Sequence, residues 1–208
     1  MNRVDPDSDG NLLPLVEEFY SVQGEGCNTG KAAYFIRVGG CDICCSWCDT
    51  KHSWNAALHP LVPVESIVSN VLAAGADSVV VTGGEPLMWN MNPLCMQLKD
   101  RGIKTFLETS GAYPLTGTWD WITLSPKKGS PPLPGIWSVA DELKVVIQHG
   151  IDFEDAEVYR QKTGPGCQHL LQPEWSRYSE MIGMITEYVK RHPDWRVSLQ
   201  AHKFMHIP

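Results

Sequence analysis

Seven apolar runs of strand length recur along the chain, and they constrain its fold more than any other feature. Most of the runs are continuous rather than alternating, which is typical of strands that are covered on both faces. Helical patterns separate several of them, and strands that alternate with helices favour a parallel sheet. The predicted strands span residues 33–38, 78–82, 104–108, 119–124, 142–147, 169–172 and 196–200.

Three amphipathic patterns predict helices between these strands. One begins at Val64 and is closed by Gly75, a second begins with Asn92 as its cap and ends at Gly102, and the longest spans residues 177–191. A weaker pattern predicts a helix over residues 153–161. A complete eight-unit barrel takes ~250 residues, more than this chain has. We therefore expect an α/β fold, a partial or shortened barrel of about six parallel strands with few helices.

Composition limits the number of domains, the location and the partners that we expect for this protein. The chain has 208 residues, of which 43% are hydrophobic and 20% are charged, so we expect one domain over residues 15–208 behind a flexible leader at residues 1–14. A membrane-spanning helix needs ~18 consecutive apolar residues, and no run approaches that length. The first residues are acidic and polar, unlike a secretory signal, which predicts a cytoplasmic protein. The net charge of -7 counts against nucleic acid as a partner.

The cysteines indicate a metal site. Of the seven cysteines, four fall within residues 41–48, a pattern that fits a metal in a reducing compartment better than a disulfide framework. Cys41, Cys45 and Cys48 are separated by three and then two residues, so one short loop can bring their sulfurs together. Three thiolates on a four-iron cluster leave one iron open to a further ligand. The spacing also leaves room for a zinc site, and for Cys44 in place of one of the three.

A second motif follows the strand predicted over residues 78–82. The segment Thr82-Gly83-Gly84-Glu85-Pro86 carries a strand into a glycine turn and an acid. Glycines let backbone carbonyls approach an ammonium group closely, and a carboxylate can complete the pairing. An ordinary strand-turn-helix connection would have the same pattern. The motif indicates a binding site only in combination with the cysteine loop upstream.

Together these two motifs resemble the radical S-adenosylmethionine superfamily. The cysteine loop has the C-x3-C-x2-C spacing of that superfamily, with Trp47 directly before the last cysteine. The resemblance implies a 4Fe-4S cluster held by Cys41, Cys45 and Cys48, with S-adenosylmethionine bound at the open iron. It also implies that the Gly-Gly-Glu-Pro turn contacts the methionine amino group.

The flanking segments are similar to those of 7-carboxy-7-deazaguanine synthases. The resemblance covers the chain from Leu15 to Pro208, and Ala201 stands where that family more often has threonine. The matching segments are residues 18–26, 35–37, 48–52, 108–111, 125–127, 142–144, 171–173 and 200–208.

The resemblance implies a lyase that contracts a ring. Its substrate would be 6-carboxy-5,6,7,8-tetrahydropterin and its product 7-carboxy-7-deazaguanine, with loss of ammonia, in queuosine and 7-deazapurine biosynthesis. A 5′-deoxyadenosyl radical would abstract hydrogen from C6. Two alternatives remain at this point: an activating enzyme that places a glycyl radical on a partner protein, and a zinc-binding module without catalysis.

The resemblance also assigns roles to residues and implies partners. Thr50 would bind Mg2+, with Asp49 as the competing candidate, and the expected partners are a second copy of the chain and a flavodoxin or ferredoxin that donates electrons. The implied substrate contacts are Val22, Gln23, Gly24, Glu25, Arg37, Thr82, His202 and Pro208. The implied S-adenosylmethionine contacts are Gly84, Glu85, Ser125, Pro126, Lys127, Gln172, Pro173, Glu174 and Trp175.

Overall fold

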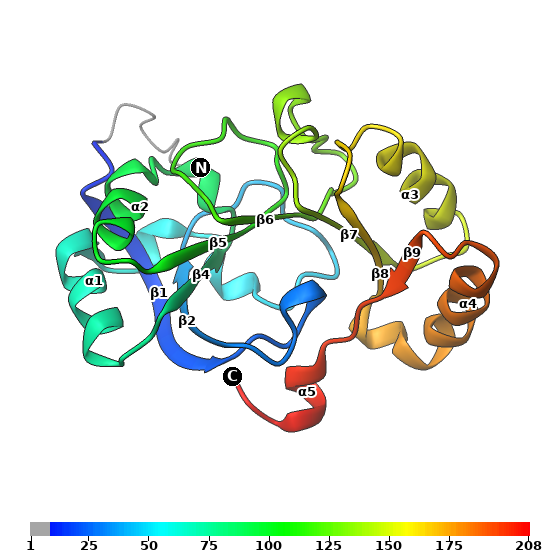
Figure 1. Ribbon diagram of the computed structural model, residues 1–208, viewed down its shortest axis with the longest axis horizontal. Helices are drawn as coiled ribbons and strands as arrows, with labels where there is room; N and C mark the ends of the chain where they lie inside the picture. The colour runs from blue at the N-terminus through cyan, green and yellow to red at the C-terminus, as the bar shows by residue number, and fades with distance from the viewer. Residues whose placement is uncertain (1–8) are drawn as a thin grey trace.

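The computed structural model describes residues 9–208, in which nine strands form one continuous sheet (Figure 1). The strands are β1 (Leu12–Val22), β2 (Ala32–Val38), β3 (Leu61–Pro63), β4 (Ser78–Gly83), β5 (Lys104–Thr109), β6 (Trp121–Leu124), β7 (Glu142–Ile147), β8 (Gln168–Pro173) and β9 (Trp195–Val197). The α-helices are α1 (Val64–Ala73), α2 (Asn92–Lys99), α3 (Asp152–Arg160), α4 (Tyr178–Arg191) and α5 (Ala201–Met205).

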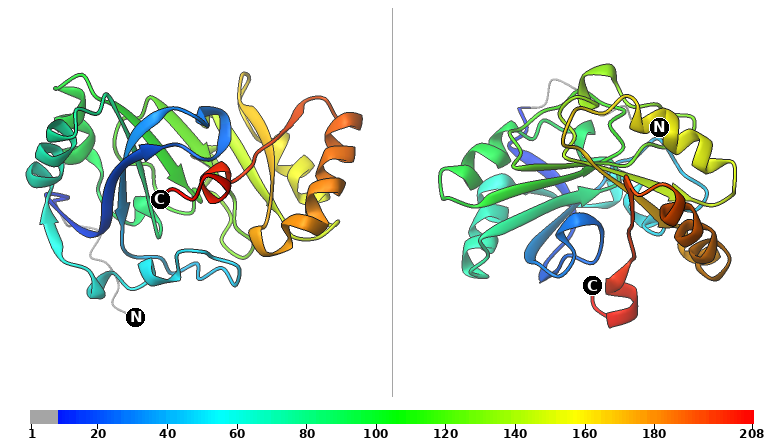
Figure 2. Two further views of the ribbon diagram at one scale, coloured as in Figure 1. Left: turned by 90° about the horizontal axis from the view of Figure 1, so that it is seen from below. Right: turned by 45° about the vertical axis from the view of Figure 1, so that its right-hand side comes forward.

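The sheet is an open, partial barrel. Its strands lie in the order β3-β1-β2-β4-β5-β6-β7-β8-β9. From β2 to β9 every neighbouring pair is parallel, whereas β1 runs antiparallel to both β2 and β3. β3 and β9 are its two edges, so the sheet curves without closing (Figure 2). The expected shortened barrel with few helices is confirmed, with one more parallel strand than the six anticipated.

Four helices cover the outer face of the sheet, and the apolar core lies beneath them (Figure 1). α1 and α2 pack over the first strands, where Ile36 of β2 and Ile67 of α1 are fully buried. α3 and α4 pack over the last strands, where Leu143 of β7 and Ile185 of α4 are fully buried. No helix within residues 9–208 combines the length and apolar character that crossing a bilayer requires.

The inner face of the sheet is different, because alternate side chains of a strand point to opposite faces. In β7, Leu143 and Val145 belong to the outer core, whereas Lys144 and Val146 line a cavity on the inner face. In β5, Leu107 points to the core and Glu108 to the cavity. The strands that read as continuous apolar runs therefore carry isolated polar residues toward the interior of the barrel.

Several predicted boundaries are wrong. The ordered chain does not begin at residue 15, because Leu12 to Pro14 pair with β3 as part of β1; the rest of the predicted leader, residues 1–8, lies outside the described residues. β6 begins at Trp121 rather than at residue 119, and β9 ends at Val197 rather than at residue 200. Asn92 is inside α2 instead of capping it, and its Oδ1 accepts a hydrogen bond from the Gly117 amide at 2.8 Å.

Two strands and one α-helix were not predicted at all: β1, β3 and α5. β1 has mostly half-buried residues, so it shows neither a continuous apolar run nor a clean alternation. β3 has three residues and α5 has five, too few to show a period. All three depend on contacts with distant parts of the chain rather than on local pattern.

Candidate functional site

The inner face of the sheet encloses a cavity of about 470 Å³. Strands, the cysteine loop and the carboxyl-terminal segment all contribute to its wall. Of the residues predicted for the site, only Pro126 is not part of the lining. The others that line it are Val22, Gln23, Gly24, Glu25, Arg37, Cys41, Cys45, Cys48, Thr50, Thr82, Gly84, Glu85, Ser125, Lys127, Gln172, Pro173, Glu174, Trp175, His202 and Pro208.

The cysteine loop presents three of its four thiols to the cavity. Cys41, Cys45 and Cys48 line the wall, whereas Cys44 is exposed, and its Sγ contacts the Cys41 carbonyl oxygen at 3.7 Å. Cys44 also has a φ of 51°, a left-handed conformation that turns the chain between Cys41 and Cys45. Burial raises the pKa of the Cys45 thiol, and the nearby charge of Lys127 opposes that effect.

The glycine turn packs directly on this loop. The Gly84 amide donates to the Val38 carbonyl at 2.9 Å, and the Glu85 amide donates to the Gly40 carbonyl at 2.8 Å. A Cβ atom on Gly84 would collide with the Gly40 carbonyl oxygen and would lie 2.9 Å from the Cβ of Cys41. Only glycine therefore lets the turn approach the cysteine loop this closely.

These features fit a 4Fe-4S cluster with S-adenosylmethionine beside it. Three free thiols share one wall of a cavity, and the absent Cβ of Gly84 leaves a cradle next to the first of them. Within residues 9–208, no group of three or more His, Cys, Asp or Glu side chains is arranged to hold a single metal ion.

The Glu85 carboxylate is occupied by the protein itself. Its Oε1 accepts from the Leu87 amide at 3.0 Å and from the Thr109 hydroxyl at 2.6 Å. Its Oε2 accepts from the Ser110 amide at 2.8 Å and from the Ser110 hydroxyl. With 1% of its surface exposed, Glu85 ties the glycine turn to the end of β5. A direct contact with S-adenosylmethionine stays a prediction.

A buried charge network spans the cavity. Lys144 Nζ lies 2.6 Å from Glu25 Oε2 and 2.9 Å from Glu108 Oε2. Glu25 also accepts hydrogen bonds from Gln172 Nε2 at 3.1 Å and from Gln200 Nε2 at 2.8 Å. Glu108 accepts one further hydrogen bond, a long one of 3.4 Å from Gln23 Nε2. Glu25 is therefore surrounded by donors, whereas Glu108 keeps accepting capacity on its Oε1.

The two carboxylates have opposite pKa shifts. Burial raises the pKa of Glu25, but the Lys144 ammonium and three hydrogen bonds outweigh it and bring the pKa down to about 2. Burial dominates at Glu108, where the charges of Glu142 and Glu25 oppose the Lys144 ammonium, and its pKa rises to about 7. The pKa of Lys144 itself is raised, because the attraction of its carboxylate partners exceeds the effect of burial. Glu25 stays ionised near neutral pH, and Glu108 is poised to exchange a proton.

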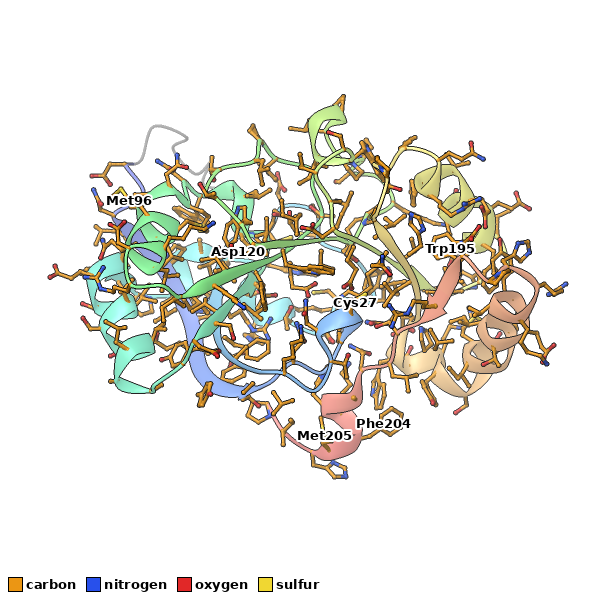
Figure 3. The ribbon with its side chains drawn as sticks, in the orientation of Figure 1. Cys27, Met96, Asp120, Trp195, Phe204 and Met205 are labelled. Carbon is orange, nitrogen blue, oxygen red and sulfur yellow. The ribbon has the colours of Figure 1, made fainter. Side chains whose placement is uncertain are left out.

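The carboxyl-terminal segment closes one side of the cavity. The Ala201 amide donates to the Gly24 carbonyl at 2.8 Å, and a Cβ on Gly24 would lie 2.6 Å from the Cβ of His202, so the imidazole sits against the Gly24 backbone. Burial lowers the pKa of His202. Phe204 of α5, labelled in Figure 3, packs edge-on against Trp175 with their ring centroids 5.3 Å apart.

Arg37 and Thr50 are both positioned by neighbours. Arg37 Nε donates to Glu17 Oε1 at 2.6 Å, which orients the guanidinium along the cavity wall. Thr50 Oγ1 lies 3.5 Å from Cys48 Sγ. Asp49, the competing magnesium candidate, instead accepts from Lys203 Nζ at 2.9 Å and from Gln200 Nε2 at 3.4 Å.

Sequence reasoning missed the roles of Glu108, Lys144 and Gln200. All three line the cavity and belong to the charge network. The first two had a signal, since a charged residue inside an otherwise apolar strand is rarely buried without a partner. Gln200 lies in the matching segment 200–208, but no local pattern links it to Glu25, which is 175 positions away.

Comparison with known proteins agrees with this site. The family model described as the radical SAM superfamily matches residues 35–158, which include the cysteine loop and the glycine turn. The chain therefore belongs to the radical S-adenosylmethionine superfamily, whose members use a 4Fe-4S cluster and S-adenosylmethionine.

Full-length relatives narrow the class. The chain is 52% identical to a 7-carboxy-7-deazaguanine synthase of Flavobacterium psychrophilum over 96% of this chain and 94% of that one. It is 47% identical to one of Synechocystis sp., with 93% of each covered. The crystal structure of QueE from Escherichia coli superposes with a TM-score of 0.82 at 30% identity, covering 92% of this chain and 95% of that one. The chain belongs to the 7-carboxy-7-deazaguanine synthase family.

Proposed function

We propose that this chain converts 6-carboxy-5,6,7,8-tetrahydropterin into 7-carboxy-7-deazaguanine and ammonia. The single observation that carries the proposal is the shared cavity: the three cysteines of the loop and a set of carboxylate, amide and arginine side chains line the same space. Nothing in the comparisons favours the glycyl-radical activating enzyme or the zinc-binding module, because the relatives match over nearly the full chain.

The cofactors would be held along one wall. Cys41, Cys45 and Cys48 would bind the 4Fe-4S cluster, and the Gly84 turn with the segments 125–127 and 172–175 would hold S-adenosylmethionine. When bound, the cluster and S-adenosylmethionine supply the 5′-deoxyadenosyl radical that abstracts hydrogen from C6 of the pterin. The protein orients both partners and keeps water away from them.

The charge network would bind the pterin. A carboxylate suits the 2-amino and ring N–H donors of a pterin edge. Glu25 already accepts from Lys144, Gln172 and Gln200, so we assign this contact to Glu108, with Gln23 beside it. The backbone of Val22 to Gly24, with Thr82, His202 and Pro208, would complete the pocket around the ring.

The substrate carboxylate needs a separate anchor. Arg37 offers a planar pair of donors that match a carboxylate, and Glu17 holds it in place. Mg2+ would bind Thr50 and the substrate carboxylate, because this ion commonly takes few protein ligands and completes its shell with substrate and water. Asp49 is the weaker candidate, since Lys203 and Gln200 already engage it.

Three further points belong to the proposal. The reaction needs an external one-electron donor of flavodoxin or ferredoxin type, and the working form would be a homodimer in the cytoplasm. Residues 15–208, with the start of β1, would fold as a single domain. Light scattering of the purified protein tests the dimer. A mass equal to that of one chain would reject the proposed homodimer.

Anaerobic reconstitution tests the function directly. The chain is loaded with iron and sulfide, then incubated with reductant, S-adenosylmethionine, Mg2+ and 6-carboxytetrahydropterin, and products are followed by mass spectrometry. We expect 7-carboxy-7-deazaguanine. Slow cleavage of S-adenosylmethionine without that product would reject the substrate, and failure to assemble any cluster would reject the radical mechanism.

The pterin contact has its own test. Pterin-6-carboxylate is compared with lumazine-6-carboxylate, which has an oxygen in place of the 2-amino group, by fluorescence titration. We expect the wild-type chain to prefer the pterin and Glu108→Gln to lose most of that preference. An unchanged preference in Glu108→Gln would show that another residue contacts the 2-amino group.

A further inference from the structure

Lys127 is a cavity cation held by two uncharged groups. Its Nζ donates to the Ser125 hydroxyl at 2.6 Å and lies 5.1 Å from the centroid of the Trp47 ring. Trp47 directly precedes Cys48, and Lys127 shares the cavity wall with Cys45 and Cys48. The geometry therefore aims an ammonium at the loop of thiols, and neither contact cancels its charge.

The next residue makes the contrast clear. Lys128 points outward with 61% of its side chain exposed, and its Nζ pairs with Asp152 at 2.5 Å and with Asp155 at 3.0 Å. Two adjacent lysines of one loop therefore have different electrostatic surroundings. The charge of Lys128 is neutralised on α3, whereas the charge of Lys127 acts inside the cavity.

We propose that Lys127 tunes the iron-sulfur cluster, raising its reduction potential by placing a positive charge beside the cysteine loop. The inference rests on the proposed function, because it needs the cluster at Cys41, Cys45 and Cys48. One-electron reduction adds negative charge to a centre that already carries three thiolates, so a nearby cation stabilises the reduced form. Net charge, hydrogen bonding and solvent exposure are the protein's means of setting such potentials. Trp47 helps to hold the ammonium in place.

The test is a redox titration monitored by electron paramagnetic resonance, made without S-adenosylmethionine so that cofactor binding plays no part. Iron and sulfide contents are measured first, and only chains with a complete cluster are titrated. We expect Lys127→Met to shift the midpoint to a more negative potential, so that at the wild-type midpoint the ratio of reduced to oxidised cluster falls several-fold. Lys127→Arg, which keeps the charge, is expected to stay near the wild-type value.

Lys128→Met is the matched control. It removes one positive charge from the same loop, and we expect no shift, because Asp152 and Asp155 already neutralise it. Equal midpoints in Lys127→Met and the wild type would overturn the proposal, as would equal shifts in Lys127→Met and Lys128→Met. If Lys127→Met does not assemble a cluster, Lys127→Gln and Trp47→Leu are titrated instead. We expect both variants to shift the midpoint to a more negative potential, and midpoints equal to that of the wild type would overturn the proposal. A wild-type chain without a cluster would reject the proposed function itself.

Discussion

Asp49 Oδ2 lies 2.9 Å from Lys203 Nζ, and this ion pair joins the cysteine loop to α5 across 154 positions of the sequence. Lys203 also lies over the Trp175 ring, with its Nζ 4.9 Å from the centroid. The carboxyl-terminal wall of the cavity is thus attached to the loop that carries the thiols. Substrate binding and the cluster loop are expected to be mechanically linked through this contact.

Removing the ammonium should loosen that wall more than it weakens the fold. Because the Asp49 side chain is 56% exposed, we expect Lys203→Met to change the free energy of unfolding by less than ~1 kcal/mol. We expect the affinity for pterin-6-carboxylate to fall several-fold, measured by fluorescence titration. Lys190→Met, which breaks an exposed pair within α4, is the control and should leave that affinity unchanged. Equal affinities in all three chains would contradict the link.

We expect three thiols of the loop to bind the cluster and the thiol of Cys44 not to bind it. We expect Cys45→Ala to lose most of its iron and sulfide after anaerobic reconstitution and to cleave no S-adenosylmethionine, while its circular dichroism spectrum stays that of a folded chain. Cys44→Ala should keep the full iron content, because Cys44 is exposed and lies outside the cavity wall. Loss of the cluster in Cys44→Ala with retention in Cys45→Ala would reverse the ligand assignment.

The Glu85 carboxylate should matter for stability even without cofactors. Glu85→Gln replaces an acceptor oxygen by an NH2 group that faces donors at Leu87, Thr109 or Ser110. A buried hydrogen bond to a charged group contributes about 1.5–3 kcal/mol, so we expect the free energy of unfolding in urea to fall by about 3 kcal/mol. Glu187→Gln on the exposed face of α4 is the control. A Glu85→Gln chain as stable as the control would show that the turn does not depend on this carboxylate.

Glu108 should make stability depend on pH near neutrality. Its pKa is raised from 4.5 to about 7, so the folded chain holds a proton that the unfolded chain releases. Its contribution to stability is complete below pH 4.5 and is lost as the pH rises through 7. We expect the wild-type chain to lose stability over this window relative to Glu108→Gln. Parallel curves of unfolding free energy against pH would contradict the raised pKa.

Glu25 should act in the opposite direction. Its pKa is lowered to about 2, so its contribution is present above its ordinary value of 4.5 and disappears as the pH falls toward 2. Below pH 4.5 we expect the wild-type chain to lose stability faster than Glu25→Gln, measured by the same unfolding curves. Equal slopes in the two chains would show that the ion pair with Lys144 does not hold the ionised form.

Much of this site could be predicted before the fold was known, because its signals are local. The spacing of Cys41, Cys45 and Cys48 and the glycine turn at Gly84 each lie within a few residues. The parallel strands β2, β4, β5, β7 and β8 can also be recognised in the sequence as continuous apolar runs, since both of their faces are covered. Such patterns depend on neighbours in sequence and can be recognised without the tertiary structure.

Only the tertiary structure decided which groups meet in the cavity. β1 and α5 have no clear local period, and they are held by pairing with β2 and by contacts with Gly24 and Asp49. The acceptors of Glu85 are filled by Leu87, Thr109 and Ser110, and those of Glu25 by three distant side chains, whereas Glu108 Oε1 has only a long hydrogen bond from Gln23. A sequence specifies which donors and acceptors exist, but a donor and an acceptor pair only where the fold brings them within hydrogen-bonding distance. That distance is set by the packing of the whole sheet.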